Sequence, residues 1–227
     1  MYQTILFDFD GTLCSSIATI VIALQKTFEH FGRPVPSQAA IAKMASSGPD
    51  LIGSFYQLDP ELGPLDDATL DTWSTYYRET YKASDVAHSD LYPGIVDLLE
   101  ALSDQGIEMV IVSNKSIESI QRSLDAFHIR SFFTEIYGDS LQHPSKPDPG
   151  VFVNHILPTR PDHALSDFLM VGDTQTDYQF AQACGIDMGW VEYGYGQLDS
   201  DALLNLKFRF ESPHAILKEL STSKSDE

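Results

Sequence analysis

The chain has 227 residues, of which 43% are hydrophobic and 21% charged, so a packed core is expected and global disorder is disfavoured. Its 14 Lys and Arg residues face 33 Asp and Glu residues, giving a formal net charge of −19. This charge argues against nucleic acid or an anionic membrane surface as the main partner. An anionic substrate would need a local cation at its binding site.

The cysteine content and the N-terminus indicate a cellular location. With only Cys14 and Cys184, a disulfide scaffold is excluded and a reduced compartment is favoured. Residues 1–10 lack the basic start of a signal peptide. The longest apolar stretch, 17–24, is far shorter than the ~20 residues of a membrane span. We therefore expect a cytoplasmic protein with no membrane partner.

The first half of the chain predicts one strand followed by helices. The β-branched and aromatic run at Thr4–Phe9 is typical of a buried strand. From residue 15 to about 87 the pattern is helical, broken by Gly-Pro and Asp-Pro turns, and contains no convincing strand. The expected helices are Ser15–Phe31, Gln38–Ala45, Asp50–Tyr56 and Asp67–Lys82.

After Pro93-Gly94 the pattern changes to alternating strands and helices. The expected strands are Glu108–Val112, Phe132–Tyr137, Asp167–Val171, Asp187–Val191 and Phe208–Phe210. The expected helices are Ile95–Gln105, Ser116–Phe127, Pro149–Leu157, Thr176–Cys184 and Pro213–Leu220. Such alternation predicts a doubly wound α/β fold with a parallel, Rossmann-like sheet. The core would comprise residues 1–14 and 88–227, with an all-helical domain inserted at 15–87.

Polar side chains follow the expected strands at one edge of this sheet. The first strand ends in Asp8 and Asp10, the second in Ser113 and the fourth in Asp173, while Lys146 lies in a loop before a helix. Ligands of such folds bind beyond the carboxyl ends of the strands. Clustered carboxylates without His or Cys favour a hard cation, Mg²⁺ above all, and Mg²⁺ with a lysine favours a phosphate ligand. An Asp not used purely as a ligand can attack phosphorus.

These segments resemble the motifs of haloacid-dehalogenase-superfamily phosphatases. DFDGTL at 8–13 is similar to the first motif, Ser113 to the second, Lys146 to the third, and GDTQTD at 172–177 to the fourth. The inserted helices resemble the helical cap of that superfamily. The overall pattern looks most like phosphoglycolate phosphatases and related bacterial pyrophosphatases.

The resemblance implies roles for the matching residues. Asp8 would be the nucleophile and a metal ligand, and Asp10 the general acid and then base, with its backbone carbonyl on the metal. Asp173 would complete the protein ligands, and Asp177 would hold metal-bound water or brace Lys146. Ser113 and the Asn114 backbone N–H would bind a phosphoryl oxygen, and Lys146 would neutralise its charge. Thr12 would fix Asp10 through a local hydrogen bond.

Substrate specificity is expected to lie in the cap. The loop containing Ser47 and Gly48 looks like the segment that dips toward the site, and Lys43 and Arg33 are candidates for contacting a second anionic group. A solvated surface position for both cations is the competing interpretation.

The sequence therefore predicts a Mg²⁺-dependent phosphatase of a small phosphorylated metabolite, phosphoglycolate-like, acting through an aspartyl-phosphate on Asp8. Three alternatives stay open: a sugar phosphomutase, which Thr12 disfavours; a pyrophosphatase, which the motifs do not separate from the first reading; and a non-catalytic binding protein on the same scaffold. The expected partner is a small phosphate ester, and the expected state is a monomer or homodimer.

Overall fold

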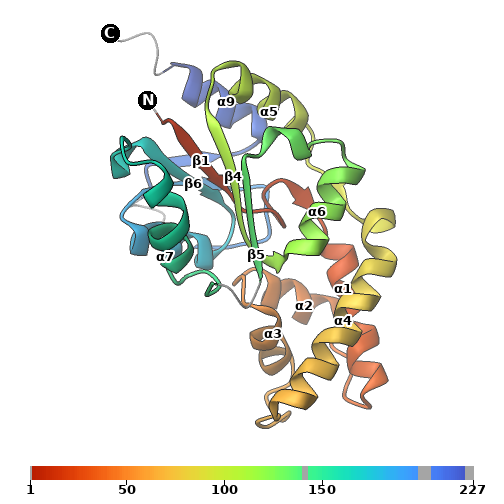
Figure 1. Ribbon diagram of the computed structural model, residues 1–227. Helices are drawn as coiled ribbons and strands as arrows, with labels where there is room; N and C mark the ends of the chain where they lie inside the picture. Colours follow the sequence, from red (N-terminus) through yellow and green to blue (C-terminus); the bar gives the residue numbers. More distant parts are fainter. Residues whose placement is uncertain (1, 140–142, 199–205, 223–227) are drawn as a thin grey trace.

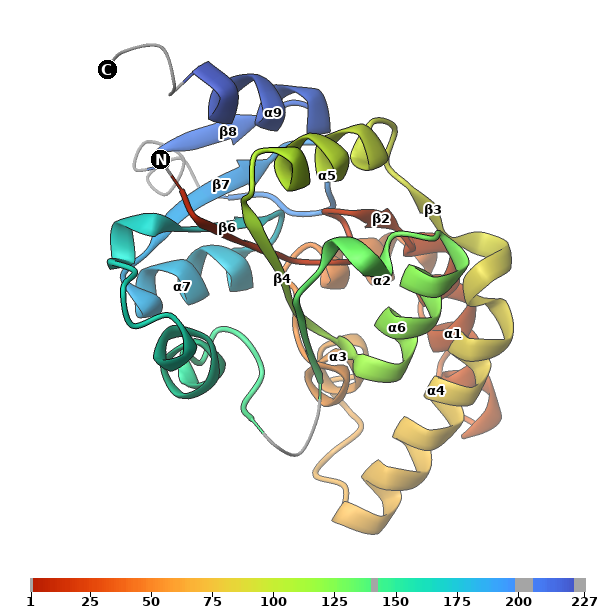
Figure 2. The ribbon, with the colours of Figure 1, turned by 45° about the horizontal axis from the view of Figure 1, so that its top comes forward.

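A parallel sheet forms the centre of the protein. The computed structural model describes residues 2–139, 143–198 and 206–222. Within them, six strands pair in the order β5-β4-β1-β6-β7-β8, of which Figure 1 labels the first four and Figure 2 labels β7 and β8. Their bounds are β1 (Thr4–Phe7), β4 (Glu108–Ser116), β5 (Glu135–Asp139), β6 (Phe168–Gly172), β7 (Asp187–Val191) and β8 (Phe208–Phe210). All pairs in this sheet are parallel, which confirms the doubly wound fold predicted from the sequence.

Helices cover both faces of the sheet (Figure 2). Because strand side chains alternate, Ile5 and Phe7 of β1 pack on one face and Leu6 on the other, all fully buried. The helices on the Phe7 face are α5 (Ile95–Asp104), α6 (Ile117–Ala126) and α9 (Pro213–Thr222). Against the Leu6 face pack α7 (Gln175–Cys184) and a π-helical turn at Phe152–Ile156. Short 3₁₀ turns lie at Arg130–Phe132, Leu157–Thr159 and Leu165–Asp167.

The inserted segment is helical and has a hydrophobic core of its own. It comprises α1 (Ile17–His30), α2 (Gln38–Ala45), α3 (Leu51–Leu58) and α4 (Asp67–His88). Asp50 and Asp66 cap α3 and α4, each accepting a backbone N–H with its side chain. The buried rings of Phe28 and Phe55 meet Trp73 edge-on, with centroids 5.4 and 5.3 Å from it. The helical cap is therefore confirmed, while the boundaries at 14/15 and 87/88 stay predictions.

A two-stranded ribbon, absent from the sequence expectations, joins the cap to the core. Strands β2 (Cys14–Ser15) and β3 (Asp90–Leu91) pair antiparallel, so the chain enters and leaves the cap side by side. Two-residue strands are too short to produce a recognisable alternation. Every helix in the described part of the chain is too short or too polar to span a bilayer.

The register of the sheet sets the position of the site. Phe7 pairs with Ile111 of β4 on one side and with Val171 of β6 on the other. The residues that follow these strands therefore emerge together. From β1 the chain adds β4 and β5 on one side, and it later adds β6, β7 and β8 on the other side, so the strand order reverses beside β1. Ligands of doubly wound folds bind at such a reversal, beyond the carboxyl ends of the strands.

Candidate active site

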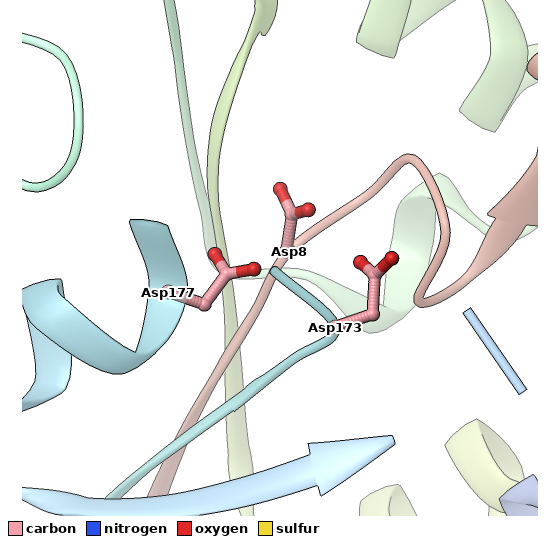
Figure 3. Close-up of side chains that lie close together, drawn as sticks. All are labelled: Asp8, Asp173 and Asp177. Carbon is pink, nitrogen blue, oxygen red and sulfur yellow. The ribbon is translucent and has the colours of Figure 1, made fainter. Parts of the chain in front are cut away.

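Three buried carboxylates meet at the carboxyl end of β1. Asp8 lies between Asp173 and Asp177 (Figure 3), and each offers an oxygen within 4.8 Å of the others. Asp173 and Asp177 have no exposed surface, and Asp8 is 6% exposed. Burial, reinforced by the charge of Asp177, raises the pKa of Asp8 to about 6 against the opposing pull of Lys146. Burial and the charges of Asp8 and Asp177 raise the pKa of Asp173 well above its usual range.

A buried lysine compensates part of this negative charge. Lys146 Nζ donates to Asp177 Oδ1 at 2.5 Å and to Asp8 Oδ1 at 2.9 Å. Burial lowers the pKa of Lys146, but the carboxylates of Asp177 and Asp8 outweigh it, and the pKa lies above its usual value. The side chain of Asn114 clamps the lysine's backbone, accepting from Lys146 N and donating to Lys146 O, both at 2.9 Å. The lysine is therefore held as a cation beside Asp8.

Asp177 is fully engaged by the start of α7. Its Oδ2 accepts from the Thr174 backbone N at 2.9 Å and from Thr174 Oγ1 at 2.7 Å, which forms the N-terminal cap of the helix. Its Oδ1 accepts from Lys146. This contact of Asp177 with Lys146 matches one of the two expected roles, that of a brace for the lysine.

Asp173 is enclosed by two loops that need glycine. Its Oδ1 accepts from Thr12 Oγ1 at 3.2 Å and its Oδ2 from the Tyr195 backbone N at 2.7 Å. The sequence predicts that Thr12 fixes Asp10, but its hydroxyl contacts Asp173 instead. A Cβ on Gly11, where φ is +87°, would lie 2.2 Å from Asp173 Oδ2, and one on Gly196 would lie 1.7 Å from the Asp173 carbonyl oxygen.

Asp10 points back toward the site from the turn after β1. Its Oδ1 accepts from Ser16 Oγ at 2.6 Å and from Lys115 Nζ at 2.9 Å. Tyr195, whose OH accepts from the Ser16 backbone N at 2.6 Å, packs behind this turn. The carboxylate is 20% exposed, more than the other site carboxylates. The Asp10 carboxylate is therefore accessible to a molecule in the cavity that it lines.

A cavity of about 140 Å³ opens above these groups, between cap and core. Asp8, Asp10, Ser113, Asn114 and Lys146 all line it. The cap contributes an apolar wall, formed by Ile20, Leu24, Met44, Leu51 and Tyr77. The residues expected to be catalytic, Asp8, Asp10 and Lys146, thus converge on one cavity.

Comparison with known proteins decides the family. The family model described as haloacid dehalogenase-like hydrolase matches residues 5–191. The chain belongs to this family. It is similar to a phosphoglycolate phosphatase from Photobacterium profundum, with 31% identity over 193 residues, covering 84% of this chain and 83% of the relative. A phosphoglycolate phosphatase from Pseudomonas putida is 29% identical over 201 residues, covering 85% of this chain and 70% of the relative.

Solved structures of haloacid dehalogenase-like hydrolases share the whole fold. One from Streptococcus pneumoniae superposes with a TM-score of 0.79 at 28% identity, covering 96% of this chain and 98% of that one. The structure of a predicted phosphoglycolate phosphatase from Haemophilus somnus gives a TM-score of 0.80 at 26% identity, with the same coverage. Both coverages include the inserted helices, so the cap is part of the shared architecture.

The four cap residues proposed from the sequence have different surroundings. Gly48 lines the cavity, and the carbonyls of Ser47 and Gly48 accept from Thr176 Oγ1 at 2.8 and 3.0 Å, so this loop docks on the core. Arg33 pairs with Asp59 through NH2 at 2.6 Å. Lys43 is exposed. Among the described residues that line the cavity, neither Arg33 nor Lys43 is present.

The sequence gave no catalytic role to Lys115, Tyr81 or Ser16. Lys115 directly follows Ser113-Asn114 at the same strand end. Tyr81 is buried, and its hydroxyl accepts from Lys115 Nζ at 2.6 Å across the cap–core boundary. A contact between residues 34 positions apart leaves no trace in local pattern.

Proposed function

We propose that this phosphatase hydrolyses a small phosphorylated metabolite through a phosphoryl intermediate on Asp8, with Mg²⁺ bound beside it. The observation that carries the proposal is the placement of Asp8. Its carboxylate directly follows the central strand β1, contacts Lys146 at 2.9 Å and lines the cavity together with Asp10 and Ser113. A nucleophile, a proton donor and two phosphate-binding groups thus surround one space.

The site suits a divalent cation of the Mg²⁺ type. The available donors are all oxygens, and clustered buried carboxylates such as Asp8 and Asp173 need a cation to offset their repulsion. Asp8, Asp173 and the Asp10 backbone carbonyl would hold the ion. When bound, Mg²⁺ neutralises charge on the phosphoryl oxygens and on the attacking carboxylate.

The residues of the chain then divide the reaction between them. A carboxylate oxygen of Asp8 attacks phosphorus as the bond to the leaving oxygen breaks, and Asp10 gives that oxygen its proton. Lys146 and Ser113 hold the phosphoryl oxygens in line. Asp10, now a carboxylate, takes a proton from water, and the resulting hydroxide attacks phosphorus. Phosphate leaves and Asp8 is regenerated, so atoms and charge balance.

The substrate we propose to test first is 2-phosphoglycolate. Relatives that cover most of this chain bear the name phosphoglycolate phosphatase. The cavity is small, which suits a leaving group of few atoms. Enclosure by the cap would exclude water until the leaving group is bound.

Phosphate release with Mg²⁺ tests the proposal, comparing 2-phosphoglycolate with pyrophosphate, sugar phosphates and nucleoside monophosphates. We expect 2-phosphoglycolate to lead, and we expect Asp8→Asn to abolish turnover with the fold retained. A sugar phosphate converted to its isomer without release of phosphate would favour a mutase, and normal turnover by Asp8→Asn would refute the nucleophile. The cytoplasmic location and the monomeric or homodimeric state stay predictions.

A further inference from the structure

A buried ammonium group joins the catalytic turn to the cap. Lys115 lies two residues beyond Ser113 on β4, and its side chain is 5% exposed. Its Nζ donates to Asp10 Oδ1 at 2.9 Å and to the Tyr81 hydroxyl at 2.6 Å. It also lies 4.8 Å from the ring centroid of Phe9 and 4.7 Å from that of Tyr81. A cation held by a carboxylate and two aromatic faces has a fixed position.

The contacts of Asp10 are directional. Ser16 Oγ and Lys115 Nζ both donate to Oδ1, at 2.6 and 2.9 Å. Two donors on one oxygen fix the rotation of the carboxylate. Because these donors occupy Oδ1 and Asp10 lines the cavity, Oδ2 is the oxygen that remains to meet a molecule bound there.

We propose that Lys115 is a positioning residue, which holds Asp10 by Oδ1 so that Oδ2 exchanges the proton with the leaving oxygen, and that Tyr81 of α4 orients Lys115 from the cap. This inference rests on the proposed function, because it assumes that Asp10 is the general acid.

The arrangement makes the general acid dependent on the cap. Tyr81 belongs to α4 of the cap, whereas Lys115 lies on the core strand β4 and Asp10 follows β1. When α4 packs on the core, its tyrosine completes the set of contacts around the lysine. Two cations of the cap itself have other partners, Arg33 with Asp59 and Arg78 with Asp139. Through Tyr81 and Lys115 the cap therefore contacts the carboxylate of Asp10.

A second role for Lys115 has to be separated from this one by experiment. Lys115 and Arg78 both line the cavity, so they can also attract a carboxylate on the substrate. If Lys115 binds a second anionic group of the substrate, its loss would raise KM, and only for substrates that carry such a group besides the phosphate. Positioning of Asp10 would show for every substrate whose leaving oxygen needs a proton.

The experiment compares Lys115→Met with the wild-type enzyme on three phosphate esters. In 2-phosphoglycolate the leaving group is alkyl and carries a carboxylate, whereas in ethyl phosphate it is alkyl and uncharged. In p-nitrophenyl phosphate the leaving group departs without a proton. The quantity measured is kcat/KM, which reports the transfer to Asp8 and excludes the later hydrolysis. We expect a loss of roughly 10- to 100-fold on both alkyl esters and of under about threefold on the aryl ester.

Three further variants separate the effect on catalysis from an effect on folding. Tyr81→Phe removes only the hydroxyl, and we expect a smaller loss with the same preference for alkyl esters. Tyr76→Phe on the same helix, whose ring stacks on His30, is the matched control and should change none of the rates. Lys115→Arg should restore part of the alkyl activity lost in Lys115→Met.

The pattern of losses over the three esters decides between these roles of Lys115. Equal losses on all three esters, or a rise in KM confined to 2-phosphoglycolate, would overturn the positioning role. A wild-type enzyme inactive on all three would overturn the proposed function and this inference with it. A loss confined to the two alkyl esters, with Tyr81→Phe following the same pattern, supports it.

Discussion

Replacing Asp8 by Asn should stabilise the metal-free protein while abolishing its activity. Burial beside Asp177 raises the pKa of Asp8 from 3.8 to about 6, so the folded protein binds this proton more tightly than the unfolded chain does. The stability that Asp8 contributes is therefore fully present below pH 3.8 and is lost as the pH rises through 6. Because a tenfold change in proton affinity is worth about 1.4 kcal/mol, the loss amounts to about 3 kcal/mol.

Asn escapes this loss because it is neutral at every pH, and its side-chain oxygen still accepts from Lys146. At about pH 7.5 in EDTA, we expect Asp8→Asn to unfold with about 3 kcal/mol more free energy than wild type, a rise in Tm of roughly 6–12 °C. Near pH 4 the two proteins should converge. Urea unfolding followed by the fluorescence of the buried Trp73 and Trp190 measures the difference.

The control is Asp104→Asn, an exposed acid at the end of α5, for which we expect a change within about 0.5 kcal/mol at either pH. Adding Mg²⁺ should reverse the order by stabilising the wild-type protein, which keeps the carboxylate ligand. An Asn variant no more stable than wild type at about pH 7.5 in EDTA would refute the account of a repelling carboxylate cluster.

Three further results are expected. EDTA should stop phosphate release and added Mg²⁺ should restore it. Turnover that continues after complete removal of divalent metal would contradict the metal assignment. Asp10→Asn should lower kcat on alkyl esters by roughly 10²- to 10⁴-fold, measured at steady state, and an unchanged rate would mean that another group moves the proton. Gly48→Ala places a Cβ 2.5 Å from Thr174 Oγ1 at a residue with φ +66°. It should lower the free energy of unfolding in urea by about 1–3 kcal/mol and raise KM, and a variant unchanged in both would show that the docked loop is unimportant.

The strand-end residues were predictable because their information is local. Asp8, Ser113 and Asp173 each follow a short apolar run, and parallel pairing brings such positions to one edge whatever the details of packing. The helical character of the insertion was likewise readable from periodicity and capping residues such as Asp66. Element ends were predicted less well: β4 runs to Ser116 instead of Val112, α4 runs to His88 instead of Lys82, and β5 begins at Glu135 instead of Phe132. The expected helix at 149–157 is a π turn at Phe152–Ile156.

What the sequence could not supply depends on long-range geometry. Charge alone suggested Arg33 as a substrate contact, but its partner is Asp59, 26 positions away. The Lys115–Tyr81 contact joins a strand end to the middle of a helix in another layer. Such pairings depend on how the helices pack against the sheet, and the periodicity of hydrophobic residues along the chain carries no information about them.

The paired strands β2 and β3 make the cap a replaceable module. Because Cys14 faces Leu91 across the ribbon, the two ends of the helical insertion lie about one strand spacing apart, near 5 Å. A different helical segment with similarly spaced ends can therefore be grafted between them without lengthening any strand of the main sheet. New leaving-group specificity can arise by exchange of this insert, provided that the newcomer offers a hydroxyl where Tyr81 now meets Lys115.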